Sequence, residues 1–188
     1  MKICVLGAAG AGTTTISKYI SFKYGYKHFE SDYFAWEQTN PPFQKTRPDV
    51  ESIKMLNTEL EKCENLVISG NIAKWGEQYK DKFDLVIFLY APTNVRLERI
   101  RYRERELYGK RVLPKGEMYQ NFEVFLNYAK AYDTGDKSFR SLSLHNDFLK
   151  IVSCPVIKVN TDANLQNILK KVYIKIDKLI LKKQKSIE

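Results

Sequence analysis

A run of glycine, alanine and threonine near the start of the chain constrains its fold more than any other feature. The nine residues from Gly7 to Thr15 read GAAGAGTTT, and they follow an apolar segment, Lys2–Leu6, and lead into a segment of helical pattern, Thr14–Tyr24. Glycine lets the backbone form a concave nest of N–H groups around an anion, and a helix start adds unpaired donors. This order predicts a loop that cradles phosphate groups; the alternative is a turn that only begins a helix.

The spacing matches the phosphate-loop motif G-x-x-x-x-G-K-[ST] with one departure. Gly7 and Gly12 occupy its glycine positions, and Thr14 stands where a hydroxyl normally binds Mg²⁺. Thr13 replaces the lysine that normally reaches the β- and γ-phosphates, a task that arginines elsewhere in the chain can share. The residues expected to hold the phosphates of a nucleoside triphosphate are Gly7, Ala8, Gly10, Ala11, Gly12, Thr13, Thr14 and Thr15.

Apolar runs and helical patterns alternate along the rest of the chain. The predicted strands are Lys2–Leu6, Lys27–Glu30, Asn65–Ser69, Phe83–Tyr90 and Pro155–Val159. The predicted helices are Thr14–Tyr24, Pro48–Cys63, Thr93–Tyr108, Glu117–Tyr132, Leu142–Val152 and Leu165–Leu181. This alternation predicts an α/β fold with a mainly parallel sheet covered on both faces. Ligands of such sheets bind beyond the carboxyl ends of the strands.

Composition narrows the class of protein further. The chain has 188 residues, which suits one domain over 1–188, and its net charge of +9 favours anionic partners. No apolar run approaches the roughly 20 residues that a membrane helix needs, so no membrane partner is expected. The three cysteines are widely spaced and predict reduced thiols in a cytoplasmic protein, without a structural zinc site.

Several motifs together resemble the adenylate-kinase-like branch of the P-loop kinases. The loop resembles the Gly-Thr-Thr-Thr loop of archaeal-type cytidylate kinases, and the resemblance continues through the segments 28–32, 40–43, 46–48, 68–70, 84–90, 96–99 and 154–156. Small proteins of this group are also called adenylate-kinase-related or topology-modulation proteins. The resemblance implies a three-layer P-loop NTPase sandwich with a five-stranded parallel sheet of order 2-3-1-4-5 and a small helical lid. It also implies that Thr13 is compatible with kinase activity.

The helix expected over Thr93–Tyr108 is rich in arginine, whose planar fork binds phosphate oxygens in pairs. Arg99 and Arg103 match an Arg-x-x-x-Arg pair that borders the lid in the family. The resemblance implies that Arg99 stacks on adenine and that Arg103 reaches the phosphates when a lid over residues 104–135 closes. It also implies that Asn160 lies in the loop that contacts adenine. The alternatives are a solvated charged face for the arginines and a simple helix cap for Asn160.

The acceptor is expected to bind the segment 33–63 and the residues beside it. Asp32 is placed at the end of the second strand, where a carboxylate orients or deprotonates an acceptor hydroxyl or binds Mg²⁺; the alternative is a turn or helix-cap role. Trp36 forms an aromatic wall or packs under the lid, and Arg47 contacts an acceptor phosphate or is a surface residue. Gly70 completes the predicted acceptor site, and no Walker-B carboxylate follows the third strand.

These observations favour an ATP-dependent kinase that uses Mg²⁺ and phosphorylates a small acceptor, a nucleoside or a nucleoside monophosphate. The predicted catalytic residues are Asp32, Arg99 and Arg103, and the predicted Mg²⁺ ligands are Thr14 and Asp32. The alternative is an ATP-binding regulator that acts on DNA or a protein partner, with little or no kinase activity. No helix-turn-helix, zinc finger or aromatic RNA-binding motif supports a nucleic-acid partner. The chain is expected to be a monomer or a homodimer.

Overall fold

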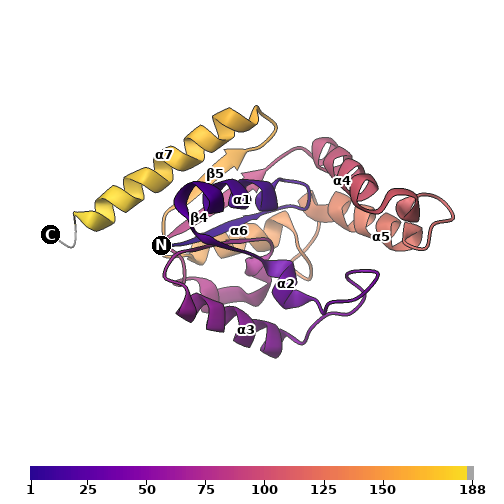
Figure 1. The fold of residues 1–188 in the computed structure, drawn as a ribbon, viewed down its shortest axis with the longest axis horizontal. Coiled ribbons are helices and arrows are strands. Elements are labelled where there is room, and N and C mark those ends of the chain that lie inside the picture. The colour runs from indigo at the N-terminus through magenta and orange to yellow at the C-terminus, as the bar shows by residue number, and fades with distance from the viewer. Residues whose placement is uncertain (186–188) are drawn as a thin grey trace.

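The computed structural model describes residues 1–185 and contains a five-stranded, wholly parallel sheet of order β2-β3-β1-β4-β5 (Figure 1). This confirms the predicted fold class and strand order. The strands are β1 (Lys2–Gly7), β2 (Lys27–Glu30), β3 (Leu66–Ser69), β4 (Leu85–Tyr90) and β5 (Val156–Asn160). The central strands β1, β3 and β4 are almost entirely buried, because apolar side chains on both of their faces pack under helices.

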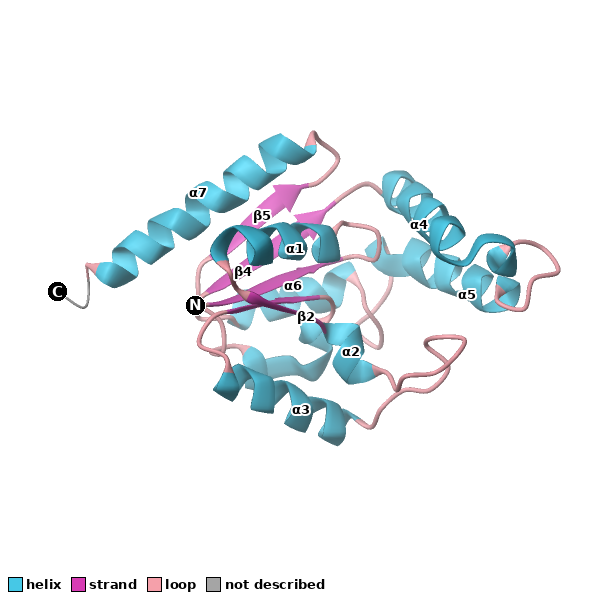
Figure 2. Cartoon of the chain, viewed as in Figure 1, coloured by secondary structure: helices cyan, strands magenta, loops and turns pink. Residues whose placement is uncertain are grey.

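Two layers of helices cover the sheet (Figure 2). Helices α1 (Thr13–Tyr24) and α7 (Leu165–Gln184) bury Ile16, Ile20 and Val172 on one face. On the other face lie α3 (Asp49–Lys62), α6 (Leu142–Ile151) and the 3₁₀ segment η1 (Ile72–Tyr79). None of the helices in residues 1–185 has the length and apolar character that a bilayer crossing demands.

Two short elements at the carboxyl edge differ from the predictions. Strand β2 ends at Glu30, and residues Ser31–Ala35 form the short helix α2, so Asp32 lies in a helix and not at the end of the strand. The prediction missed α2 because five residues are too few to show a helical period. It also missed η1, whose run is broken by the non-helical backbone of Gly76.

Beyond the carboxyl edge, a helical lobe projects away from the sheet (Figure 1). It consists of α4 (Thr93–Tyr108), the turns η2 (Gly109–Val112) and η3 (Ala131–Asp133), and α5 (Tyr119–Lys130). The predicted helix over Glu117–Tyr132 is thus shorter than expected. The lobe has its own small core of Ile100, Leu126 and Ala129, which holds α4 against α5.

A buried arginine fastens this lobe to the sheet. The side chain of Arg96 is fully buried and donates hydrogen bonds to the Ala91 carbonyl (3.0 Å), the Ala129 carbonyl (3.0 Å) and the Asp133 carboxylate (2.8 Å). A buried guanidinium is tolerated only when its donors are satisfied and its charge is paired. Arg96 therefore joins the start of α4 to the end of α5 as a structural residue.

Candidate functional site

The loop Gly7–Thr15 runs from the carboxyl end of β1 to the first turn of α1. Gly10 has φ +78°, and a Cβ at this position would lie 2.5 Å from the Arg96 carbonyl oxygen. Its backbone conformation and its contact with α4 therefore both require glycine. Within the loop, the Ala11 amide donates to the Ala8 carbonyl at 3.1 Å. The loop has the shape, the glycines and the helix start that a phosphate cradle needs.

A carboxylate that the sequence analysis did not select lies beside this loop. Thr14 Oγ1 donates to Glu30 Oε2 at 3.3 Å, and Glu30 is the last residue of β2. Mg²⁺ prefers oxygen ligands and usually keeps several waters together with one or two carboxylates and substrate phosphates. Thr14 and Glu30 fit that requirement. The available signal was the position of Glu30 at the carboxyl end of a predicted strand.

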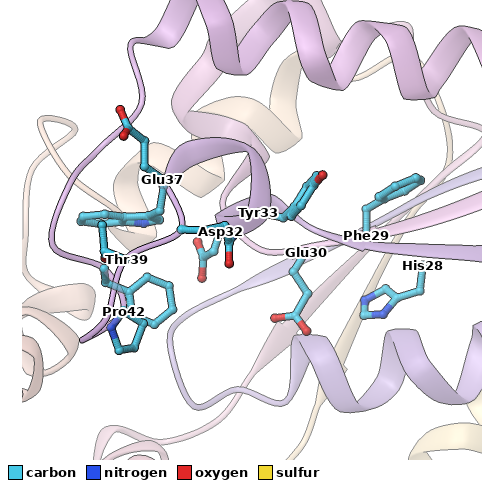
Figure 3. A pocket seen from close by; sticks show the side chains of 11 residues that line it. His28, Phe29, Glu30, Asp32, Tyr33, Glu37, Thr39 and Pro42 are labelled. Atoms are coloured by element: carbon cyan, nitrogen blue, oxygen red, sulfur yellow. The ribbon is translucent and has the colours of Figure 1, made fainter.

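A cavity of about 390 Å³ opens next to Glu30 (Figure 3). Its lining comes from β2, α2 and the loop that follows α2, and it comprises His28, Phe29, Glu30, Asp32, Tyr33, Trp36, Glu37, Gln38, Thr39, Pro42 and Phe43. The rings of Trp36 and Phe43 meet edge to face, with centroids 5.7 Å apart. In Figure 3 the carboxylates of Glu30 and Asp32 point to the same side of the chain. The cavity therefore combines an aromatic wall with two neighbouring carboxylates.

Arg47 and Gly70 do not line this cavity. Arg47 donates from Nε to the Phe34 carbonyl (3.1 Å) and from Nη2 to the Trp36 carbonyl (3.4 Å), so its guanidinium holds the ends of the loop together. Gly70 has φ +121°, and a Cβ there would lie 2.0 Å from Ser31 Oγ. Its role in this structure is to let β3 approach α2 closely.

The two arginines predicted to act together lie in different surroundings. Arg99 donates from Nη2 to the Thr161 carbonyl at 2.8 Å, and Thr161 Oγ1 donates to the Ala11 carbonyl at 2.9 Å. Arg99 is thus joined through Thr161 to the loop and to the segment that follows Asn160 at the end of β5. Arg103 instead pairs with Glu104 at 2.6 Å, and half of its side chain is exposed. The structure does not bring Arg103 to the phosphate loop.

Arg140, which was not among the predicted site residues, lies directly against the loop. Its Nε and Nη2 donate to the Gly7 carbonyl at 2.9 and 2.6 Å, across 133 positions of sequence. These contacts bring a positive charge to the Gly7 end of a loop in which Thr13 replaces the usual lysine. A single arginine between two predicted helices gave no local signal of this contact.

A buried polar chain links the carboxyl end of β3 to the base of the lobe. His145 is fully buried, and burial, with a smaller effect of Arg140, lowers the pKa of its imidazole to about 3. The neutral ring donates from one nitrogen and accepts at the other. Because Asn71 Oδ1 lies 3.1 Å from Nε2, we assign the proton to Nε2, and Nδ1 accepts from the Tyr132 hydroxyl at 2.7 Å. His145 thus has a structural role in this buried chain.

The chain resembles known proteins in sequence. A family model described as an AAA domain (AAA_18) matches residues 3–123. The uncharacterized protein YqaC of Bacillus subtilis is 37% identical over 164 residues, which cover 87% of this chain and 90% of that protein. The cytidylate kinase of Pyrococcus horikoshii is 36% identical over 114 residues, which cover 55% of this chain and 58% of that enzyme. The chain therefore matches a little over half of that enzyme's length.

Solved structures share the fold at lower identity. A shikimate kinase from Bacteroides thetaiotaomicron superposes with a TM-score of 0.56 at 18% identity, covering 96% of this chain and 98% of that chain. The deoxyadenosine kinase from M. mycoides with bound dCTP gives a TM-score of 0.53 at 20% identity, covering 95% of this chain and 100% of that chain. These likenesses concern the fold alone.

Proposed function

Because the chain belongs to the AAA_18 family of P-loop kinase-like proteins, we propose that it is an ATP-dependent phosphotransferase whose acceptor is a nucleoside or a nucleoside monophosphate. The observation that carries this proposal is the position of the aromatic, carboxylate-bearing cavity directly beside the Thr14–Glu30 pair of the phosphate loop. A phosphoryl donor and an acceptor could thus be held side by side. The name of the cytidylate kinase relative agrees with this class of reaction.

On the donor side, the backbone N–H groups of Gly7–Thr15 would hold the triphosphate of ATP, with Thr13 in place of the usual lysine. Arg99 and Asn160 flank the side of the loop where we place the adenine. Arg140 would add positive charge near the phosphates. When the lid over residues 104–135 closes and excludes water, the Arg103 side chain would leave Glu104 and bind a phosphate group.

Thr14 and Glu30 would hold Mg²⁺. Asp32, which lines the same cavity as Glu30, would act on the ion through a bound water. The ion would neutralise charge that develops on the transferred group. Asp32 would orient the acceptor hydroxyl and accept its proton. The acceptor oxygen then forms a bond to the γ-phosphorus, the bond from that phosphorus to the bridging oxygen breaks, ADP leaves, and the proton passes to solvent.

We also propose that the protein works in the cytoplasm as a monomer or a homodimer. All three cysteines are free, and Cys4 is fully buried, which agrees with a reducing compartment.

The proposal is tested by ADP release from Mg-ATP across a panel of nucleosides, nucleoside monophosphates and small hydroxy acids. We expect one acceptor to raise the rate by about a hundredfold or more over the acceptor-free rate, as positioning effects of this size are usual. ATP binding without stimulation by any acceptor would contradict the kinase assignment and favour the regulator. Steep salt dependence of DNA binding would then identify the class of partner.

A further inference from the structure

The lining of the acceptor cavity has an unusual charge balance. It contains the carboxylates of Glu30, Asp32 and Glu37, yet within residues 1–185 it includes no lysine or arginine. Its histidine, His28, has Nε2 at 3.0 Å from Ser69 Oγ. Glu37 is paired with Lys45 at 2.9 Å. Apart from His28, the charged side chains of the lining are therefore carboxylates.

Three arginines that lie outside the lining have other partners. Arg47 is held by the Phe34 and Trp36 carbonyls, and Arg140 is held by the Gly7 carbonyl on the donor side. Arg111, in the lobe, pairs with Glu117. Side-chain recognition of a phosphate group typically uses arginine or lysine donors, and like charges brought together weaken binding. The cavity is poorly suited to an acceptor that already carries a phosphate.

The aromatic part of the lining suits a planar, uncharged ring. Phe43 and Tyr33 are large side chains that remain 53% and 52% exposed, and both face this cavity together with Trp36. Stacking of a base on such a side chain typically raises affinity by about tenfold or more. Hydroxyl groups of a sugar can donate to carboxylates, which only accept hydrogen bonds.

We propose that the acceptor is an unphosphorylated nucleoside, with its base against Trp36 and Phe43 and its hydroxyl at Asp32, and that the site discriminates against nucleoside monophosphates. This inference rests on the proposed kinase function and narrows its acceptor class. The proposed acceptor differs from cytidylate, the nucleotide in the names of the sequence relatives, because cytidylate carries a phosphate. The hydroxyl oxygen receives the γ-phosphoryl group of ATP, Asp32 takes the proton, and ADP is released.

The test pairs each common nucleoside with its own 5′-monophosphate, at fixed ionic strength, and measures both binding by calorimetry and kcat/KM for phosphorylation. We expect at least one nucleoside to bind about tenfold more tightly than its monophosphate and to be the better acceptor by a similar factor. A monophosphate that binds and reacts as well or better overturns the inference but leaves the kinase function intact. Failure of every nucleoside to bind also overturns it. Nucleoside binding without phosphorylation supports the site assignment while refuting the kinase function.

A charge substitution sharpens this test. Gln38 lines the cavity and is exposed, so Gln38→Lys adds a cation there without touching the residues assigned to catalysis. Gln184→Lys is the matched control, because it makes the same change on an exposed residue at the far end of α7 (Figure 1). We expect Gln38→Lys to improve monophosphate binding relative to nucleoside binding about fivefold and Gln184→Lys to change the ratio by less than twofold. An equal response of the two variants contradicts the role assigned to the cavity's charge.

Discussion

The donor side and the acceptor side of the candidate site are built differently. On the donor side, the loop Gly7–Thr15 is fixed by backbone contacts, by Arg140 on the Gly7 carbonyl and by the fully buried Arg96 behind Gly10. On the acceptor side, the cavity lies under an irregular loop, and Phe43 and Tyr33 remain half-exposed. The α5 lobe reaches this loop through Asn121 Nδ2, which donates to Gln44 Oε1 at 3.4 Å.

The difference separates the residues that bind phosphate from those that select the acceptor. Phosphate groups are the same in every nucleotide, so a buried backbone cradle can serve them without side-chain variation. The choice of acceptor depends on exposed side chains of a loop, which can change at little cost to stability. Changes on the donor side should therefore affect every acceptor equally, whereas changes on the acceptor side should affect discrimination. The four predictions below test this contrast, from the largest expected effect to the smallest.

Asp32→Asn should have the largest effect. Loss of a general base typically lowers turnover by about 10²–10⁴-fold, so we expect kcat to fall about a thousandfold with ATP affinity nearly unchanged. Steady-state kinetics and ATP titration measure both quantities. Glu37→Gln, which changes a neighbouring carboxylate of the same cavity, is the control and should retain kcat within about threefold. Equal losses in the two variants would remove the special role of Asp32.

Arg96→Met tests the support of the donor side. Removing one partner of a buried pair typically costs about 3–5 kcal/mol; because the Asp133 side chain is 31% exposed, we expect a loss of about 3 kcal/mol in the free energy of unfolding. Urea denaturation measures it. Arg101→Met, at an exposed position of the same helix, should change stability by less than about 0.5 kcal/mol. Similar stabilities of the two variants would contradict the anchoring role of Arg96.

Trp36→Ala tests the acceptor wall. Loss of one stacking partner should raise the acceptor KM by about tenfold and leave the KM for ATP unchanged. Trp36→Phe keeps an aromatic ring and should recover most of the acceptor affinity. If the KM for ATP rises in parallel with that for the acceptor, Trp36 does not belong to the acceptor side alone.

His145 gives stability a pH dependence. Burial holds its pKa at about 3, below the usual value of 6.5, so the folded protein keeps the ring neutral while the unfolded chain takes up a proton as the pH falls below 6.5. The stability present above pH 6.5 should therefore decline toward pH 3, by about 1 kcal/mol for the first unit below 6.5.

The measurement is denaturant unfolding at pH 6.5 and 5.5. The free energy of unfolding of His145→Gln should be lower than that of the wild type at pH 7, but it should change much less between these two pH values. His28→Gln provides the comparison, because His28 is only half-buried and its pKa is lowered by the same cause. Parallel pH profiles of the wild-type protein and His145→Gln would show that His145 is not the titrating group.

The strand, loop and helix around Gly7–Thr15 and the alternation of the remaining elements were predictable from local periods and from glycine positions, which act within one turn or strand. The order of the sheet was implied by the resemblance to the P-loop kinases. The period of α4 was also clear, and the predicted helix over Thr93–Tyr108 has the bounds that the structure shows.

Which side chains meet depends on tertiary packing. Arg140 reaches Gly7 across 133 positions and His145 reaches Asn71 across 74, and no local pattern encodes such contacts. The same holds for Glu30, which meets Thr14 because α1 packs beside β2, and for Arg47, whose guanidinium turns to backbone carbonyls. The residue types in the sequence indicate which chemical groups are present. The packing of α1, α6 and the lobe on the sheet determined where that chemistry is placed, because buried polar groups usually require a hydrogen-bond partner.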